Sequence, residues 1–275
     1  MRNASYRAAT PIIVLAWIVA SGGSALAQAK QGPPPIKDNS FLIEEAYNQE
    51  AGVVQHISTF TRPTSGTGWA FSFTQEWPVT GMRHQFSYTV PFLDAGGSGV
   101  GDLALNYRYQ LAGLSGERVA AAPRLSIVLP TGDEASGKGG GGAGLQANFP
   151  VSVELNPAFT LHTNAGFTHT QSAKDAGGNT AATTSFGAGG SLIWLASPTF
   201  NVMLESVWAS NERVTGAGAT ASSKSFVISP GVRKAFNLAS GMQIVPGAAY
   251  VIGVGPSSGS ESLFVYFSVE HSFRH

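Results

Sequence analysis

The chain has 275 residues, of which 12% are charged, compared with about 25% in ordinary soluble domains. Its formal net charge is zero, which gives no electrostatic support to nucleic-acid binding, and the absence of cysteine excludes a disulfide framework and thiolate metal sites. The 34 glycines and few charges are typical of a transmembrane β-barrel, in which half of each strand is polar and faces the lumen.

The N-terminus has the features of a secretory signal peptide. Arg2 and Arg7 precede the apolar run PIIVLAWIVA at residues 11–20, and Ala25-Leu26-Ala27 has the small residues of a cleavage site. The apolar run is shorter than the roughly 20 residues that a membrane-spanning helix needs. We therefore predict a signal peptide over residues 1–27 and a mature chain that begins at Gln28.

Residues 28–52 are expected to lie outside the strands. Residues 28–39, QAKQGPPPIKDN, are proline-rich and predict a linker. Residues 40–50, SFLIEEAYNQE, predict a short helix, with Asn39 or Ser40 as N-cap and Gly52 at its end. The sequence leaves open whether this helix lies on the periplasmic side or enters the mouth of the barrel, where it would plug the pore.

From residue 53 onward, apolar and polar residues alternate with the period of two that defines a strand. Leu103, Leu105 and Tyr107 share one parity, for example, and Asn106 and Arg108 share the other. The pattern predicts an all-β, up-and-down antiparallel transmembrane barrel over residues 53–275. The expected strands, about twelve, are 53–62, 68–79, 83–93, 101–111, 119–130, 144–155, 158–171, 183–196, 199–211, 224–238, 242–254 and 261–274.

The links between these strands also indicate a barrel. Short links such as 156–157 and 197–198 alternate with long, glycine-rich links at 131–143, 172–182 and 212–223. Outer-membrane barrels have this arrangement, with short periplasmic turns and longer extracellular loops.

Large aromatic residues occur on the outward parity at spacings that suit a membrane. Trp69 and Trp77 are eight positions apart, which corresponds to a rise of roughly 20 Å along a tilted strand, close to the height of an outer-membrane apolar band. The alternative is the core of a soluble β protein, but a single outward apolar face on every strand leaves no second layer to cover it. The predicted membrane girdle consists of Trp69, Trp77, Tyr107, Tyr109, Trp194 and Trp208.

Ionisable residues fall on the inward parity and predict a wet lumen all the way round. They can brace the wall as a network of ion pairs, or they can form a charged path that selects solutes; bracing is the favoured interpretation, and the two are compatible. The predicted lumen-lining residues are Glu76, Asp102, Arg108, Arg124, Glu154, His162, Glu205, Arg233 and Glu270.

Motifs for chemistry are weak. The GDEASGK segment at 132–138 has the spacing of a phosphate-binding loop, but Gly139 stands where a serine or threonine is required. His162 and His169 have opposite parity and point to opposite sides of the wall, so plain strand histidines are favoured over a hydrolase site. We predict no catalytic residues, no metal site and no cofactor.

Several segments together resemble a known family. Gly101-Asp102-Leu103, Pro123-Arg124-Leu125 and Leu129-Pro130-Thr131-Gly132-Asp133, with the opening segment 40–50, are similar to the MetA-pathway phenol-degradation family, over roughly residues 38–275. This resemblance implies a bacterial outer-membrane transporter, and it carries no binding or catalytic residues over to this chain. One departure concerns the end of the chain, where Phe273 is followed by Arg274 and His275, whereas outer-membrane barrels commonly end on an aromatic residue.

The function predicted from the sequence is passive uptake of a small solute, of aromatic or hydrophobic character, through a channel of intermediate width. The expected partners are the lipid bilayer with lipopolysaccharide, the barrel-assembly machinery and the solute itself. The alternatives are an outer-membrane hydrolase and a barrel with a structural or surface-binding role that transports nothing.

Overall fold

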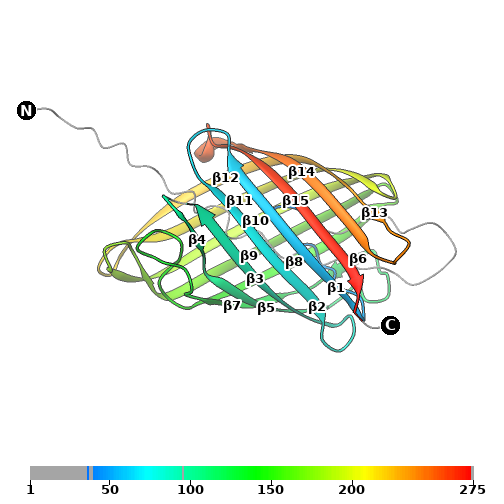
Figure 1. Cartoon of the computed structure of the whole chain (residues 1–275), viewed down its shortest axis with the longest axis horizontal. Coiled ribbons are helices and arrows are strands. Elements are labelled where there is room, and N and C mark those ends of the chain that lie inside the picture. Colours follow the sequence, from blue (N-terminus) through cyan, green and yellow to red (C-terminus); the bar gives the residue numbers. More distant parts are fainter. Residues whose placement is uncertain (1–35, 37–39, 95, 274–275) are drawn as a thin grey trace, which may run out of the picture.

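The computed structural model describes residue 36, residues 40–94 and residues 96–273. The predicted signal peptide and most of the predicted linker lie outside these residues. The described chain forms one antiparallel sheet that closes on itself as a 12-stranded barrel, which confirms the predicted fold class (Figure 1). No helix in this part of the chain is long and apolar enough to cross a membrane.

The first half of the barrel contains β1 (Val53–Pro63), β2 (Trp69–Pro78), β3 (His84–Asp94), β4 (Ser98–Val100), β5 (Leu103–Tyr109), β6 (Val119–Ala121), β7 (Arg124–Leu129) and β8 (Gly144–Asn156). The second half contains β9 (Phe159–Lys174), β10 (Thr180–Ser197), β11 (Phe200–Gly216), β12 (Ala219–Lys234), β13 (Phe236–Asn237), β14 (Gln243–Gly253), the 3₁₀ turn η1 (Gly255–Ser257) and β15 (Glu261–Ser272).

Each barrel strand pairs with its neighbours in the sequence, and β15 pairs with β1 to close the ring. β6 continues the line of β7 along β8, and β13 continues the line of β12 along β14. The predicted strands therefore correspond in number and order to the strands of the wall, because the alternation of apolar and polar residues indicates which side of the wall each residue faces.

Strands β9 to β12 are longer than the sequence predicts. They contain 16, 18, 17 and 16 residues, whereas a tilted strand crosses a membrane in about 9–11. The predicted long links 172–182 and 212–223 are consequently wrong, since the observed links are 175–179 and 217–218. The extra residues are mainly Ser, Thr and Ala; they keep the sheet hydrogen bonds but lack the apolar alternation from which strand ends were predicted.

The two ends of the barrel differ. One end, here called the short-turn end, holds the links 157–158 and 198–199 together with the start of β1 and the end of β15. The opposite end, here called the long-loop end, holds the 130–143 loop and the projecting parts of β9 to β12.

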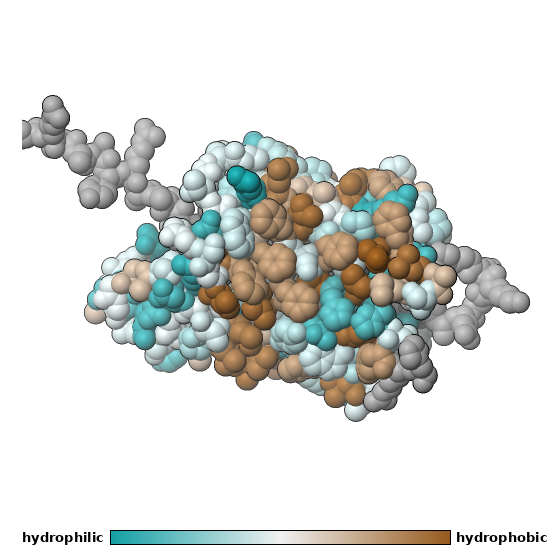
Figure 2. Space-filling view, in the orientation of Figure 1, coloured by the Kyte–Doolittle hydropathy of each residue, from teal (hydrophilic) through white to brown (hydrophobic). Residues whose placement is uncertain are grey.

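The outer surface carries large apolar side chains that no protein layer covers. Among the predicted girdle residues, Tyr107, Trp194 and Trp208 are exposed, while Trp69, Trp77 and Tyr109 are half-buried among outward neighbours. Figure 2 shows a broad hydrophobic region over one side of the barrel. Exposed leucines and phenylalanines continue this surface on β8 and β15, and Leu125 and Ile127 continue it on β7, as expected of a wall that faces lipid.

Candidate functional site

A segment of the chain before β1 runs through the barrel lumen, and we call residues 40–49 the strap. Every residue of the strap is buried, with at most 8% of its surface exposed. Just before it, Ile36 donates its N–H to the carbonyl of Pro198 in the short β10–β11 turn. After it, the chain reaches β1 at Val53, so the strap enters and leaves at the short-turn end and crosses the lumen between opposite walls.

The helix predicted for residues 40–50 is wrong, because this segment has no helical residues. Side chains of the wall take the hydrogen bonds that helix carbonyls would otherwise accept. The N–H of Ala46 donates to Ser152 Oγ at 2.8 Å and that of Asn48 donates to Gln110 Oε1 at 2.8 Å. The N–H of Gln49 donates to Gln85 Oε1 at 2.6 Å.

The polar half of the strap, residues 44–49, lies against β2, β3, β5, β7 and β8. Its central contact is the ion pair between Glu44 and Arg124, whose Nε lies 2.8 and 3.0 Å from the two carboxylate oxygens. Both side chains are at most 5% exposed. A buried charge of this kind is tolerable only because its partner and hydrogen bonds accompany it.

Arg108 holds the same half of the strap at its far end. Its guanidinium donates to Asn48 Oδ1 at 2.8 Å and to the carbonyl oxygens of Glu45 and Tyr47. The same group lies 4.0 Å from Glu76, which also accepts a hydrogen bond from Gln85 at 2.8 Å. One planar side chain therefore fixes two backbone carbonyls and one side-chain amide of an irregular segment.

The apolar half of the strap, residues 40–43, lies against β1, β10, β11, β12, β14 and β15. Phe41 stacks on Tyr266 with 5.2 Å between ring centroids, and it lies 5.4 Å from the ring of Phe264. Leu42 belongs to the same buried cluster as Ile57, Ile193 and Met203. The lumen is therefore not lined by polar groups all the way round, as predicted, because inward apolar side chains and the strap form an apolar cluster in this half, beside buried polar residues such as Ser191 and Ser229.

Glycines in the wall make room for this half. A Cβ on Gly247 would lie 2.4 Å from Phe41 Cζ, and one on Gly189 would lie 2.6 Å from Ile43 Cγ2. The glycines that blur the alternation around residues 187–190 thus include one that receives a strap side chain.

Glu205 holds the backbone of the apolar half. Its Oε1 accepts the N–H groups of Phe41 and Leu42 at 3.0 Å each, and its Oε2 lies 3.2 Å from the Leu42 nitrogen. Successive backbone N–H groups that converge on one carboxylate form an anion-binding nest. This carboxylate therefore fixes the strap backbone at Phe41 and Leu42, and the buried residues Ser191 and Ser229 lie opposite it on the two neighbouring strands.

The structure places most of the predicted lumen residues at the strap. Arg108, Arg124 and Glu205 contact it directly, Arg233 donates to the Ile36 carbonyl, and Glu270 accepts from Gln49 at 3.0 Å. Glu76 lies behind Arg108. His162 hydrogen-bonds through Nδ1 to Ser152 Oγ at 2.7 Å, beneath the strap.

Asp102 lies apart, at the long-loop end. Its carboxylate accepts the N–H of Gly132 at 2.9 Å and that of Gly140 at 2.7 Å, so it anchors the 130–143 loop. Burial raises the pKa of Asp102 above its usual range, against the opposing effect of the two N–H donors. Nearby, Thr131 Oγ1 accepts the Leu103 N–H and donates to the Gly101 carbonyl. The Gly-Asp-Leu and Pro-Thr-Gly-Asp segments thus meet in one loop junction.

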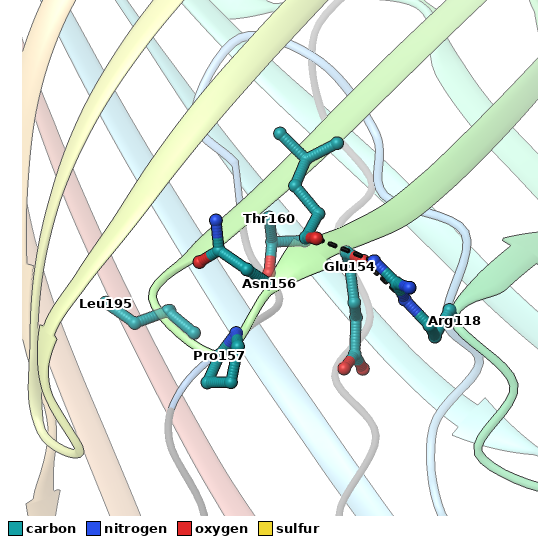
Figure 3. A pocket seen from close by; sticks show the side chains of 7 residues that line it. Arg118, Glu154, Asn156, Pro157, Thr160 and Leu195 are labelled. Carbon is teal, nitrogen blue, oxygen red and sulfur yellow. Dashed lines mark hydrogen bonds between the residues drawn. The ribbon is translucent and has the colours of Figure 1, made fainter.

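Glu154 borders a cavity of about 610 Å³ at the short-turn end (Figure 3). Leu155, Pro157 and Leu195 give it apolar walls, and Thr160 contributes a buried hydroxyl without a hydrogen-bond partner in the described chain. Arg118 closes one side by donating to the carbonyls of Glu154 and Leu155. The cavity therefore has apolar walls and a polar side formed by Arg118 and Glu154, and the Thr160 hydroxyl is enclosed behind its surface.

Sequence reasoning missed Gln85, Gln110 and Ser152, which receive the strap backbone. All three have inward parity, so the alternation places them on the lumen side, but a neutral side chain in an alternating strand gives no further sign that it binds another segment. Within the described part of the chain, no three metal-ligating side chains of the His, Cys, Asp and Glu types gather in one place.

Comparisons with known proteins agree with this architecture. A family model described as "Putative MetA-pathway of phenol degradation" matches residues 34–267. An outer-membrane channel of the COG4313 group from Pseudomonas putida F1 is similar in structure, with a TM-score of 0.63 and 12% identity, over 83% of this chain and 98% of that one. The NanC porin is similar with a TM-score of 0.50 and 10% identity, over 80% of this chain and 100% of that one.

The KdgM porin also matches, with a TM-score of 0.50 and 8% identity, over 80% of this chain and 99% of that one. The comparison with curated proteins gave no match. At these identities the structural matches show the fold, a barrel of the outer-membrane porin and channel type.

Proposed function

The chain belongs to the MetA-pathway phenol-degradation family, and we propose that it is an outer-membrane channel through which small aromatic or hydrophobic solutes enter passively. The short-turn end would face the periplasm and the long-loop end the exterior, as in other barrels with this loop arrangement. The surrounding lipid bilayer with lipopolysaccharide, and the barrel-assembly machinery that inserts the chain, are the partners that this proposal requires.

The observation that carries the proposal is the strap. A barrel of intermediate width leaves limited space in its lumen, and the strap is buried there. Side chains of the strap pack against glycines of the wall. A solute must pass beside the strap or displace it. Either route selects against bulky, strongly hydrated molecules, because half of the surroundings are apolar.

The cavity at the short-turn end supports the same solute class. A phenol combines a flat apolar ring with one hydroxyl group. Leu195 and Pro157 match the ring in character, and the side chains of Arg118 and Glu154 at the same cavity are polar, as is the solute hydroxyl. We propose that the cavity is a resting point on the path.

The inward charges serve mainly as braces in this proposal. Arg108 and Arg124 use their donors on the strap and on neighbouring wall residues. A guanidinium group whose N–H donors are already hydrogen-bonded to the protein attracts a passing anion only weakly. Selectivity would therefore come from size and apolar character more than from charge.

The test is a liposome-swelling assay with phenol and with sugars of increasing size. It compares the full mature chain with a version that lacks residues 28–50. We expect phenol to enter through the full chain faster than sugars of similar mass, and the deletion to admit both. Equal exclusion of phenol and sugars by both proteins would contradict a channel function.

A hydrolase remains the second candidate because Ser152 Oγ lies 2.7 Å from His162 Nδ1. However, the same hydroxyl accepts the Ala46 N–H, and the strap covers both side chains completely. We propose that this pair holds the strap and that the chain is not an enzyme. Ester hydrolysis by the purified protein that disappears in Ser152→Ala would overturn that view.

A further inference from the structure

A pair of histidines lies on the outer surface of the barrel, where β1 meets β15. His56 faces Val269 across the two strands, and His271 faces Val54, so the two imidazoles are diagonal neighbours on one face. Figure 2 shows a hydrophilic patch within the hydrophobic surface where β1 and β15 approach the short-turn end. Polar groups on such a surface are unusual, and they call for a role beyond packing.

The geometry of the pair suits a metal ion. The two Nε2 atoms are 3.2 Å apart, and the ring centroids are 5.3 Å apart. Two imidazole nitrogens at 2.0–2.1 Å from one tetrahedral zinc ion are separated by about 3.3–3.4 Å. The separation of the two nitrogens therefore matches that of two ligands of one metal ion, which would take the place of the proton that they share.

The second ring nitrogen of His271 strengthens this interpretation. Its Nδ1 lies 3.1 Å from the carbonyl oxygen of Ser272, to which it can donate. A metal-ligating histidine typically donates its other N–H to such an acceptor, which fixes the tautomer and leaves the opposite nitrogen with a free lone pair. His56 is held in place by stacking on Phe73, with 6.1 Å between ring centroids.

We propose that His56 and His271 together bind a divalent late first-row metal ion, Cu²⁺, Ni²⁺ or Zn²⁺, and that the ion clamps the first strand of the barrel to the last. Imidazole is a preferred ligand of these ions, whereas Mg²⁺ and Ca²⁺ prefer oxygen ligands. No third His, Cys, Asp or Glu joins the pair among the described residues, so water completes the coordination. The ion would consequently exchange with the medium.

This site is independent of the strap and of the transported solute. The β1–β15 pairing closes the barrel, so a bound ion cross-links the two strands whose separation would open it. Because the ion binds the folded barrel and not the separated strands, it should shift the unfolding equilibrium by mass action.

The experiment uses the full mature chain in detergent, purified without a histidine tag. CuCl₂, NiCl₂, ZnCl₂, MgCl₂ and CaCl₂ are each titrated by calorimetry, and the Cu²⁺ complex is measured by electron paramagnetic resonance. We expect one tight site with Cu²⁺ bound most strongly, no matching site for Mg²⁺ or Ca²⁺, and a spectrum with two coordinated nitrogens. The metal should raise the unfolding temperature, and EDTA should reverse the rise.

Matched variants locate the site. His56→Ala and His271→Ala should each weaken binding by more than about tenfold, since even loss of an outer-shell partner costs about 10–100-fold. His84→Ala removes another outward histidine, one that bonds to the Tyr107 hydroxyl, and His169→Ala removes one bonded to Thr184; both should bind as the wild type does. If an alanine variant fails to fold by circular dichroism, His56→Gln and His271→Gln replace it.

Three results would overturn the proposal. The first is unchanged affinity in the His56 and His271 variants. The second is an equal loss of affinity in His84→Ala, which would indicate scattered surface binding. The third is a copper spectrum that keeps two nitrogens after His271 is replaced.

Discussion

The two halves of the strap lie in the same lumen but are held by different kinds of interaction. Residues 44–49 are fixed by hydrogen bonds and by the Glu44–Arg124 ion pair, whereas residues 40–43 are fixed by Phe41 and Leu42 in an apolar core. Polar contacts define position sharply because each donor needs its own acceptor, but their net free energy is modest. Apolar burial is less directional and contributes more free energy per side chain.

This difference suggests a division of roles. The apolar half would act as the anchor, and the polar half would set the path of the strap and respond to changes in hydration. The chain contains no cysteine, so single cysteines at Ala46 and Leu42 can report separately on the exposure of each half to a thiol reagent.

The largest effect is expected from Arg124→Ala. This change leaves the Glu44 carboxylate buried without its partner, which typically costs about 3–5 kcal/mol. The polar half should leave the wall, so a cysteine at position 46 should react much faster while one at position 42 stays protected. Equal protection of position 46 with and without Arg124 would show that the ion pair does not hold this half.

Phe41→Ala should loosen the other half. Truncating a buried phenylalanine typically costs about 3–5 kcal/mol, and here the cavity would lie beside Tyr266 and Phe264. A cysteine at position 42 should become reactive, while position 46 should change little. Phe41→Leu is the matched control and should retain most of the protection; simultaneous release of both positions would indicate that the strap moves as one unit.

A smaller effect is expected at Glu205, which holds the backbone of the apolar half. Glu205→Gln keeps the shape of the side chain but removes the charge that accepts the Phe41 and Leu42 N–H groups. The expected loss is about 1 kcal/mol, the difference between a charge-assisted hydrogen bond and a neutral one. Denaturant titration of the reactivity at position 42 should detect it. No shift would mean that the carboxylate contributes nothing beyond its shape.

Lys174→Ala provides the smallest effect and the control for Arg124→Ala. The Lys174–Glu134 pair has 3.7 Å between its charged atoms, but both side chains are well exposed, so the expected change is about 0–1 kcal/mol. Reactivity at positions 42 and 46 should stay at the wild-type level. A large change would show that the long-loop end communicates with the strap.

The strands of the barrel wall could be predicted from the sequence, whereas the conformation of the strap inside the barrel could not. Alternation around Leu103 to Tyr109 reports directly which side of a strand faces lipid, so strand number and order followed from it. The strap was predicted as a helix because Glu44, Glu45 and a polar N-cap are favourable in an isolated segment. What overrides that preference is a set of wall acceptors more than 30 positions away in the chain, such as Gln85 and Ser152, which no local pattern reveals.

The apolar cluster around residues 40–43 could not be predicted from the sequence for a related reason. Ile57, Ile193 and Phe264 have inward parity. The alternation of a strand shows which side such a residue faces, but it does not show that another segment of the chain covers that residue. Gly247 likewise carries no local signal in the sequence, because its role is to leave room for Phe41, a residue that is distant in the chain.

The account depends most on the strap as the element that closes the lumen. The most direct measurement is single-channel conductance in planar bilayers for the full mature chain, for the version without residues 28–50, and for a version in which residues 40–49 are replaced by glycine and serine. We predict small conductance for the full chain and a large, stable increase for both altered versions. Equal conductance in all three proteins, with folded barrels confirmed by circular dichroism, would contradict the account.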